Sequence, residues 1–161
     1  MASSIGLVGI RLVLAVVLFA HGAHKLFGAF AGPGIGPGGV DNTAAHLVSL
    51  GLQPAFFLAA AGGLTQFLGG ILIGIGWFSR WLAGANFIYL VVGIWKEHGQ
   101  WGLFLNWIGD PGRGHGVEYS IVLAAMMLYL VIAGPGDYSI DGRRQRYVAA
   151  RAAGRARLRR A

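Results

Sequence analysis

Four long apolar stretches constrain this chain more than any other feature. They cover residues 5–27, 55–78, 81–95 and 117–134. An α-helix rises about 1.5 Å per residue, so about 20 apolar residues cross a hydrocarbon layer ~30 Å thick. The third stretch is shorter, and its flanking Trp81 and Trp95 fit a thin or tilted span, with a re-entrant segment as the alternative. The pattern predicts an all-α polytopic membrane protein in which four transmembrane helices form a bundle.

Positive charge is concentrated in the last nineteen residues. Eight of the thirteen Lys and Arg residues follow Gly142, with no acidic residue among them. Because Lys and Arg collect on the cytoplasmic side of membrane proteins, we expect this tail in the cytoplasm, and four crossings place the N-terminus there too. We therefore divide the chain into a four-helix membrane domain, residues 1–142, and a basic cytoplasmic tail, residues 143–161.

The tail is a candidate lipid-binding segment. Arg143, Arg144 and Arg146 lie closest to the membrane domain, and juxtamembrane basic residues attract anionic head groups. A docking surface for an acidic cytoplasmic partner is the alternative. Nucleic acid is not an expected partner, because no aromatic stacking module accompanies the arginines.

The sequence lacks the residues that a self-contained enzyme of the common classes would use. The chain has no cysteine, which excludes disulfides, thiol catalysis and Cys-ligated clusters. His21 and His24 have an i, i+3 spacing, but no HExxH or comparable metal signature is present. We expect no metal site and no certain cofactor, and any redox role would need a bound carrier or a partner subunit.

The connections and the second stretch carry local structural signals. Glycine and proline are too dense in residues 32–39 for a helix, whereas residues 41–43 can cap a short helix that ends at Gly51. Gly70 and Gly74 have the GxxxG spacing that lets helix backbones approach closely. This spacing predicts packing within the bundle, with homodimerisation through the same face as the alternative.

Polar residues within the apolar stretches are the candidate inner site. Depth along the predicted helices allows four of them to converge as an inner pocket: Arg11, Gln66, Asn86 and Tyr89. Structural hydrogen bonding between helices explains such a cluster as well as ligand binding does. Arg11 alone could instead reach the cytoplasmic head groups.

A second polar layer is predicted at the outer mouth of the bundle. Lys25 shares a helix face with Arg11, Glu118 begins the fourth stretch as its natural partner, and His21 lies nearby. Interfacial ion pairs are one interpretation of this layer. A site for an anion or a head group is the other.

Several motifs together resemble the DoxX family of bacterial membrane proteins. They are Arg11, His21-Gly-Ala-His-Lys-Leu-Phe-Gly28, Leu64-Thr-Gln-Phe-Leu-Gly-Gly70, Glu118-Tyr119 and the closing Gly134-Pro-Gly-Asp-Tyr-Ser-Ile-Asp141. The resemblance runs from about residue 5 to residue 141. The family usually has a glutamate where this chain has Gln66. If that glutamate is an ion-pair partner or a proton carrier, this chain lacks it, and neutral dipoles would then hold Arg11.

The resemblance implies a four-helix bundle in the bacterial plasma membrane. Some members are associated with membrane redox systems, including thiosulfate–quinone oxidoreductases and complexes that handle oxidative stress. Our leading hypothesis is an accessory subunit of such a complex that binds a quinone or a lipid, or holds a redox-protein partner. A small-molecule permease or channel-like protein is the second hypothesis, and a structural assembly subunit is the third.

Overall fold

The computed structural model describes residues 2–32 and 36–158. Over this part of the chain every regular element is helical, so the predicted all-α fold is confirmed. The elements are α1 (Ala2–Phe27), α2 (Val40–Ser49), α3 (Ala55–Ile75), α4 (Ser79–Gly93), the π-helical turn η1 (Ile94–His98), the 3-10 turn η2 (Gly99–Trp101), α5 (Glu118–Ala133) and α6 (Ile140–Leu158). Arg159 and Arg160 of the predicted tail lie outside the described residues.

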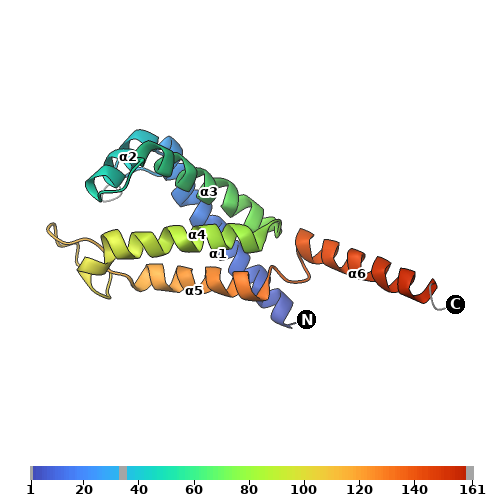
Figure 1. The fold of residues 1–161 in the computed structure, drawn as a ribbon. Helices are drawn as coiled ribbons and strands as arrows, with labels where there is room; N and C mark the ends of the chain where they lie inside the picture. Colours follow the sequence, from blue (N-terminus) through green and yellow to red (C-terminus); the bar gives the residue numbers. More distant parts are fainter. Residues whose placement is uncertain (1, 33–35, 159–161) are drawn as a thin grey trace.

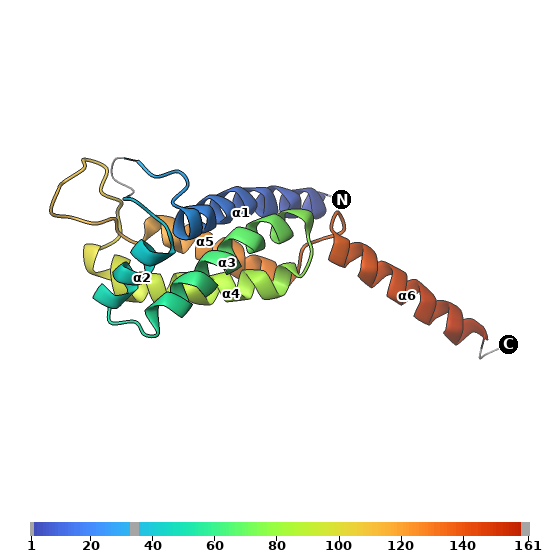
Figure 2. The ribbon, with the colours of Figure 1, turned by 90° about the horizontal axis from the view of Figure 1, so that it is seen from above.

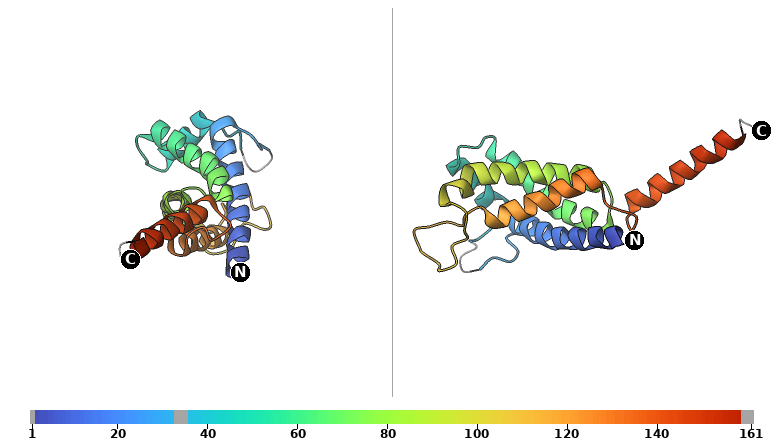
Figure 3. Two further views of the ribbon diagram at one scale, coloured as in Figure 1. Left: turned by 90° about the vertical axis from the view of Figure 1, so that its right-hand side faces the viewer. Right: turned by 90° about the horizontal axis from the view of Figure 1, so that it is seen from below.

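Helices α1, α3, α4 and α5 lie lengthwise beside one another in an elongated bundle (Figure 1). The short helix α2 lies at the end of the bundle where α1 finishes, beside the two long loops (Figure 2). At the opposite end α6 leaves the bundle near the N-terminus and projects away from it (Figure 3). Helix α6 begins at Ile140 and therefore includes the last residues that we assigned to the membrane domain.

The helix bounds follow the predicted apolar stretches, with differences at glycines. The second stretch was expected to reach residue 78, but α3 ends at Ile75 because Gly76 takes a left-handed conformation with φ of 77°. Helix α4 then begins at Ser79, and η1 continues it without a break in helical backbone conformation. Two helical segments, Ser4–Phe27 and Ala55–Ile75, are long and apolar enough to cross a membrane, whereas the apolar α5 is shorter.

Glycines set the distance between α1 and α3, which make the most extensive helix contact in the protein. A Cβ atom at Gly22 would collide with the α3 backbone at Gln66 and Phe67. A Cβ atom at Gly70 would collide with the α1 backbone at Ala15 and Phe19. The GxxxG face of α3 therefore packs against α1, as expected for packing within the bundle.

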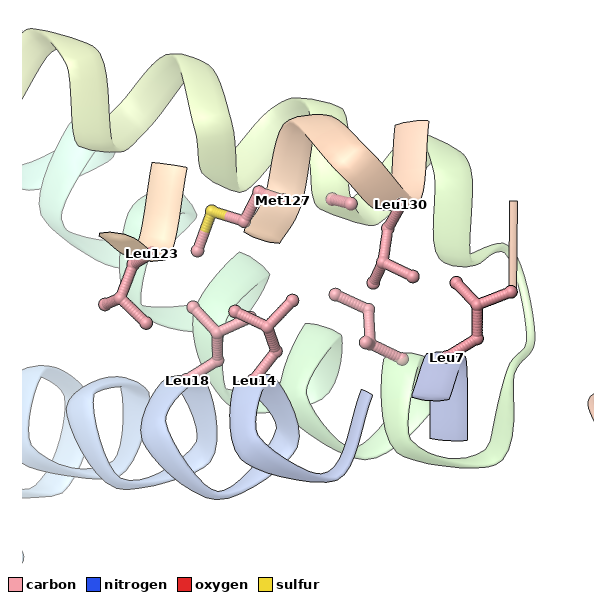
Figure 4. Close-up of a cluster of buried hydrophobic side chains, with 8 residues drawn as sticks. Leu7, Leu14, Leu18, Leu123, Met127 and Leu130 are labelled. Atoms are coloured by element: carbon pink, nitrogen blue, oxygen red, sulfur yellow. The ribbon is translucent and has the colours of Figure 1, made fainter. Parts of the chain in front are cut away.

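A cluster of buried apolar side chains fills the middle of the bundle and extends toward the end from which α6 projects (Figure 4). We call that end of the bundle the inner end and the end that carries α2 the outer end. Its labelled members project toward one another from α1 and from α5. They are Leu7, Leu14, Leu18, Leu123, Met127 and Leu130. We call this set, together with Ile73 and Ala83, the apolar cluster.

Candidate functional site

A cavity of about 430 Å³ opens into the outer half of the bundle, on the α2 side of the apolar cluster. Helices α1 to α5, η1 and the loop before α5 all contribute to its wall. Most of the lining is aliphatic, including Leu18, Leu47, Leu90, Leu123 and Met127. The polar lining residues include Lys25, Gln66, Asn86 and Tyr89. An apolar cavity with few polar groups is the usual form of a small-molecule site.

Asn86 and Gln66 supply the buried polar groups of this cavity. Asn86 is only 1% exposed, and its Nδ2 donates to the carbonyl oxygens of Leu82 (2.8 Å) and Thr65 (3.3 Å). Its Oδ1 and the Oε1 of Gln66 are buried without a hydrogen-bond partner among the described residues. A buried acceptor without a partner costs about 1–3 kcal/mol. Both oxygens have almost no accessible surface, so they lie within the packed wall and not on its face.

Lys25 and Tyr89 form a pair on the cavity wall. Lys25 Nζ donates to Tyr89 Oη over 3.0 Å and lies 4.3 Å from the centre of the same ring. Gly62 lets the ring lie close to α3, because a Cβ atom there would collide with the Tyr89 side chain. The ammonium and the phenol hydroxyl give this wall hydrogen-bond donors.

His21 and His46 are among the histidines that line the cavity where it reaches the surface. His21 of α1 faces Tyr119 of α5 with 6.4 Å between ring centres, and both residues line the cavity and are exposed. His46 of α2 lies 3.2 Å from the Glu97 carboxylate of η1, an ion pair when the imidazole is protonated. Glu118 does not line the cavity, and in the described part of the chain it makes no ion pair with Lys25.

Arg11 lies outside this cavity, which differs from the expected convergence with Gln66, Asn86 and Tyr89. Its side chain is 4% exposed and points to the opposite end of the bundle. The guanidinium donates to the carbonyl oxygens of Ile73 (3.1 Å), Gly74 (2.9 Å), Pro135 (2.8 Å) and Tyr138 (2.9 Å). The last carbonyls of α3 carry the negative end of the helix dipole, so they attract this cation, although the carbonyl of Ile73 also accepts from the Gly76 amide.

The closing segment, residues 134–141, completes the inner end around Arg11. Ser4 Oγ donates to Asp137 Oδ2 over 2.9 Å, and Arg146 Nη1 donates to Asp137 Oδ1 over 2.6 Å. These bonds, the one from Ser4 first, lower the pKa of Asp137 below its ordinary value. Asp141 Oδ2 accepts a 3.1 Å hydrogen bond from the Ser79 amide at the start of α4. The segment thus ties α1, α3, α4 and α6 together.

The apolar cluster separates the two polar regions. Along α1, Leu14 and Leu18 lie between Arg11 and His21, and along α3, Ile73 lies between Gln66 and the carbonyl of Gly74. Leu14 and Ile73 have no exposed surface. Figure 4 shows Leu14, Leu18 and Met127 filling this level of the bundle. Arg11 and the cavity are therefore not parts of one polar route.

The three arginines proposed as lipid ligands lie on the first turns of α6, and all are exposed. Arg146 is paired with Asp137. Arg144 lines a groove of about 490 Å³ between α6 and the inner end of α4, together with Arg80, Trp81 and Val148. Within the described residues, no group of three or more His, Cys, Asp or Glu side chains could hold a metal ion.

Sequence reasoning missed the contacts between distant segments. The hydrogen bond from Lys25 to Tyr89 and the contribution of α2 to the cavity depend on how the helices pack. Residues 134–141 were noted as a motif, but nothing in them indicated that the carbonyls of Pro135 and Tyr138 accept from Arg11. Likewise, no signal marked Asn86 as lying beside Thr65.

Comparison with known proteins identifies the family of this chain. No curated protein and no solved structure matches this chain. A sequence model of the DoxX family matches residues 6–99. The match covers α1 to η1, and with them Lys25, Gln66, Asn86 and Tyr89 of the cavity. Because it covers more than half of the chain, the protein belongs to the DoxX family.

Proposed function

We propose that this DoxX-family membrane protein is an accessory subunit of a redox complex in the bacterial plasma membrane and that its cavity binds a quinone or a lipid. The cavity is the observation that carries the proposal. Its aliphatic walls suit an apolar body, and Lys25, Tyr89, Gln66 and Asn86 suit a polar head. The exposed pair His21 and Tyr119 marks a lateral opening between α1 and α5, through which a ligand dissolved in the membrane can reach the cavity.

Four membrane crossings are part of this proposal. Helix α4 and η1 together run from Ser79 to His98, and a continuous helix of that length is about 30 Å long. All four bundle helices expose large apolar side chains, as lipid-facing surfaces do. Examples are Leu12 and Val16 on α1, Phe57 and Leu68 on α3, Ile88 and Val91 on α4, and Val122 and Ile132 on α5.

The orientation follows from charge. The basic helix α6 lies at the same end of the bundle as the N-terminus (Figure 1), and Arg80 lies in the short connection at that end. The positive-inside rule places both termini in the cytoplasm and the cavity near the outer face. Arg143 and Arg144 then lie at the level of the inner head groups, where they would bind anionic lipid.

Two other functions were considered from the sequence. A permease needs a continuous polar route, and the apolar cluster, with Leu14 and Ile73 fully buried, argues against one. A structural assembly subunit is favoured by a specific observation, because α6 projects from the bundle and leaves its basic surface free to contact an acidic partner protein (Figure 3).

Co-purification tests the cavity proposal. The full chain would be purified in mild detergent, and bound small molecules and proteins would be identified by mass spectrometry. Gly93 lines the cavity, and a Cβ atom there has no neighbour within 4 Å, so Gly93→Leu places a side chain in open space. Gly9 on α1 also has no neighbour within 4 Å and is not a lining residue, which makes Gly9→Leu the matched control.

We expect one quinone or lipid per protein in the wild type and in Gly9→Leu. In Gly93→Leu the affinity for this ligand should fall at least about tenfold, because the added side chain occupies space in which the ligand would bury apolar surface. A protein partner without any small molecule, retained in Gly93→Leu, would replace the cavity proposal with the assembly function. Equal ligand content in both variants would show that the ligand binds elsewhere.

A further inference from the structure

The Lys25 ammonium carries an inference about the ligand of the cavity, and this inference rests on the proposed function. Lys25 is half-buried on the cavity wall. Among the described residues its ammonium has no acidic side chain within ion-pair distance, and its hydrogen bond goes to the neutral hydroxyl of Tyr89. Glu118, the partner expected from the sequence, does not line the cavity. The cavity therefore holds a positive charge for which the described chain supplies no counter-ion.

The other charged groups of the lining leave this charge uncompensated. The described lining contains one acidic side chain, Glu97, whose carboxylate lies 3.2 Å from Nε2 of His46. Lys96 is a second basic lining residue, but its ammonium lies 4.4 Å from the centre of the ring of Trp95, which is exposed and is not a lining residue. The lining histidines can add positive charge but never negative charge. Lys25 is thus the cation that a ligand inside the cavity can meet.

Lys25 and Tyr89 hold two donors side by side. The ammonium has three N–H groups, of which one donates to Tyr89 Oη over 3.0 Å. The phenol oxygen accepts that bond, and its own O–H remains able to donate. A carboxylate has two acceptor oxygens, so one oxygen can accept from each donor while the negative charge neutralises the ammonium. A neutral head group could accept from the same donors, but it would leave the ammonium without a counter-ion.

The rest of the cavity suits a hydrocarbon chain. Aliphatic side chains from three helices line it, among them Leu18 of α1, Leu90 of α4 and Leu123 and Met127 of α5. Leu18, Leu123 and Met127 also belong to the apolar cluster, which bounds the cavity on the side of the inner end. The volume of about 430 Å³ is in the usual range for a small-molecule site. Head and chain are therefore both provided for within one cavity.

We infer that the cavity binds the anion of a single-chain fatty acid. The carboxylate accepts hydrogen bonds from Lys25 and from the Tyr89 hydroxyl. Lys25 lies near the outer end of α1, which ends at Phe27, so the hydrocarbon chain runs from there toward the apolar cluster. This assignment narrows the lipid of the proposed function to one with a negatively charged head.

The test compares ligands that share a chain and differ in the head. Decanoate, decanol and decyltrimethylammonium would be titrated into the purified full chain in a neutral detergent at about pH 8, where a carboxylic acid is ionised. Bound ligand would be counted by native mass spectrometry, with Gly93→Leu, whose added side chain occupies the cavity, as the background. We expect decanoate to bind at least about tenfold tighter than decanol, the difference that one charge-assisted hydrogen bond makes. The ammonium compound should not exceed the background.

Variants assign the preference to the lysine. Lys25→Met keeps an unbranched side chain and removes the charge, so the preference for decanoate over decanol should fall to about twofold or less. Lys25→Arg keeps a cation and should keep the preference. Tyr89→Phe keeps the ring beside the ammonium and removes one donor, so decanoate should bind about fivefold more weakly. The control is Arg113→Met, which removes the same charge from an exposed position that does not line the cavity. If Lys25→Met fails to fold, Lys25→Gln and the ligand series in the wild type decide.

The outcomes separate this inference from the function on which it rests. Equal affinities for decanoate and decanol in the wild type, both above the Gly93→Leu background, would overturn the inference and leave the cavity as a site for a neutral lipid or a quinone. A preference that survives in Lys25→Met would overturn the assignment to Lys25. No binding above background by any of the three compounds would overturn the inference, and the co-purified ligand would then decide the proposed function by itself.

Discussion

At the scale of single residues, Arg11 shows how the chain stabilises a charge inside an apolar helix. A buried charge is tolerated when its hydrogen-bonding groups are all engaged. Four carbonyl oxygens surround the guanidinium, from the end of α3 and from the closing segment. Arginine suits this position because its donors spread in a planar fork, which a lysine ammonium cannot reproduce.

Replacement of Arg11 tests this structural role. Arg11→Leu removes the guanidinium from four carbonyls, of which only that of Ile73 keeps another donor, the Gly76 amide. We therefore expect a loss of about 3 kcal/mol in the free energy of unfolding. Arg80→Leu is the control, because Arg80 is exposed and makes one such bond, to Val131. Thermal unfolding of both variants in detergent measures the difference. A stable Arg11→Leu protein that has lost its ligand would contradict this assignment and return Arg11 to the binding site.

At the scale of elements, the contact between α1 and α3 depends on the absence of side chains. Gly22 faces the α3 backbone at Gln66 and Phe67, and Gly70 faces the α1 backbone in turn. Backbones cannot move aside as flexible side chains can. The close approach also fixes the position of Gln66 in the cavity wall, so helix packing and the site depend on the same glycines.

A pair of alanine substitutions on α1 tests this close approach. Gly22→Ala should lower the free energy of unfolding by about 1–3 kcal/mol, since the added methyl group meets backbone atoms. Gly9→Ala meets no atom within 4 Å and should be neutral or stabilising by up to about 1 kcal/mol, because alanine favours the helix. The measurement is unfolding in detergent. Equal stabilities for the two variants would mean that α1 and α3 do not approach each other as closely as they do in this structure.

At the scale of the whole molecule, the bundle is asymmetric along its length. The outer half is hollow, the middle is filled by the apolar cluster, and the inner end is closed by Arg11 and residues 134–141. The cavity therefore lies toward one end of the molecule, away from Arg11 and residues 134–141. The proposed orientation places that end away from the cytoplasm.

The absence of native cysteine makes the orientation directly testable. Ala45 of α2 and Ala150 of α6 are both exposed. The two helices lie at opposite ends of the molecule (Figure 1). In spheroplasts a membrane-impermeant maleimide should label Ala45→Cys at once and Ala150→Cys only after permeabilisation. Leu128→Cys, on the exposed apolar face of α5, should stay unlabelled in both cases because lipid covers it. The opposite order of labelling would invert the proposed topology.

The sequence by itself determined the helical class and the family. Apolar runs of membrane length leave backbone groups to be satisfied within each helix, so the helices are dictated locally. Their ends were set by Gly76 and Gly134, whose backbone conformations are local properties of the chain. The motifs around His21, Gln66 and Asp141 were enough to identify the DoxX family, which the family match over residues 6–99 confirms.

Only the tertiary structure decided which polar residues meet. Depth along a helix placed Arg11, Gln66, Asn86 and Tyr89 at compatible levels, but depth does not fix the rotation of each helix or the course of the closing segment. The carbonyls at the end of α3 and in residues 135–138 hold Arg11 at the inner end. The apolar cluster then separates it from the cavity. Side-chain partners depend on the packing of segments far apart in the chain, and no local pattern records that packing.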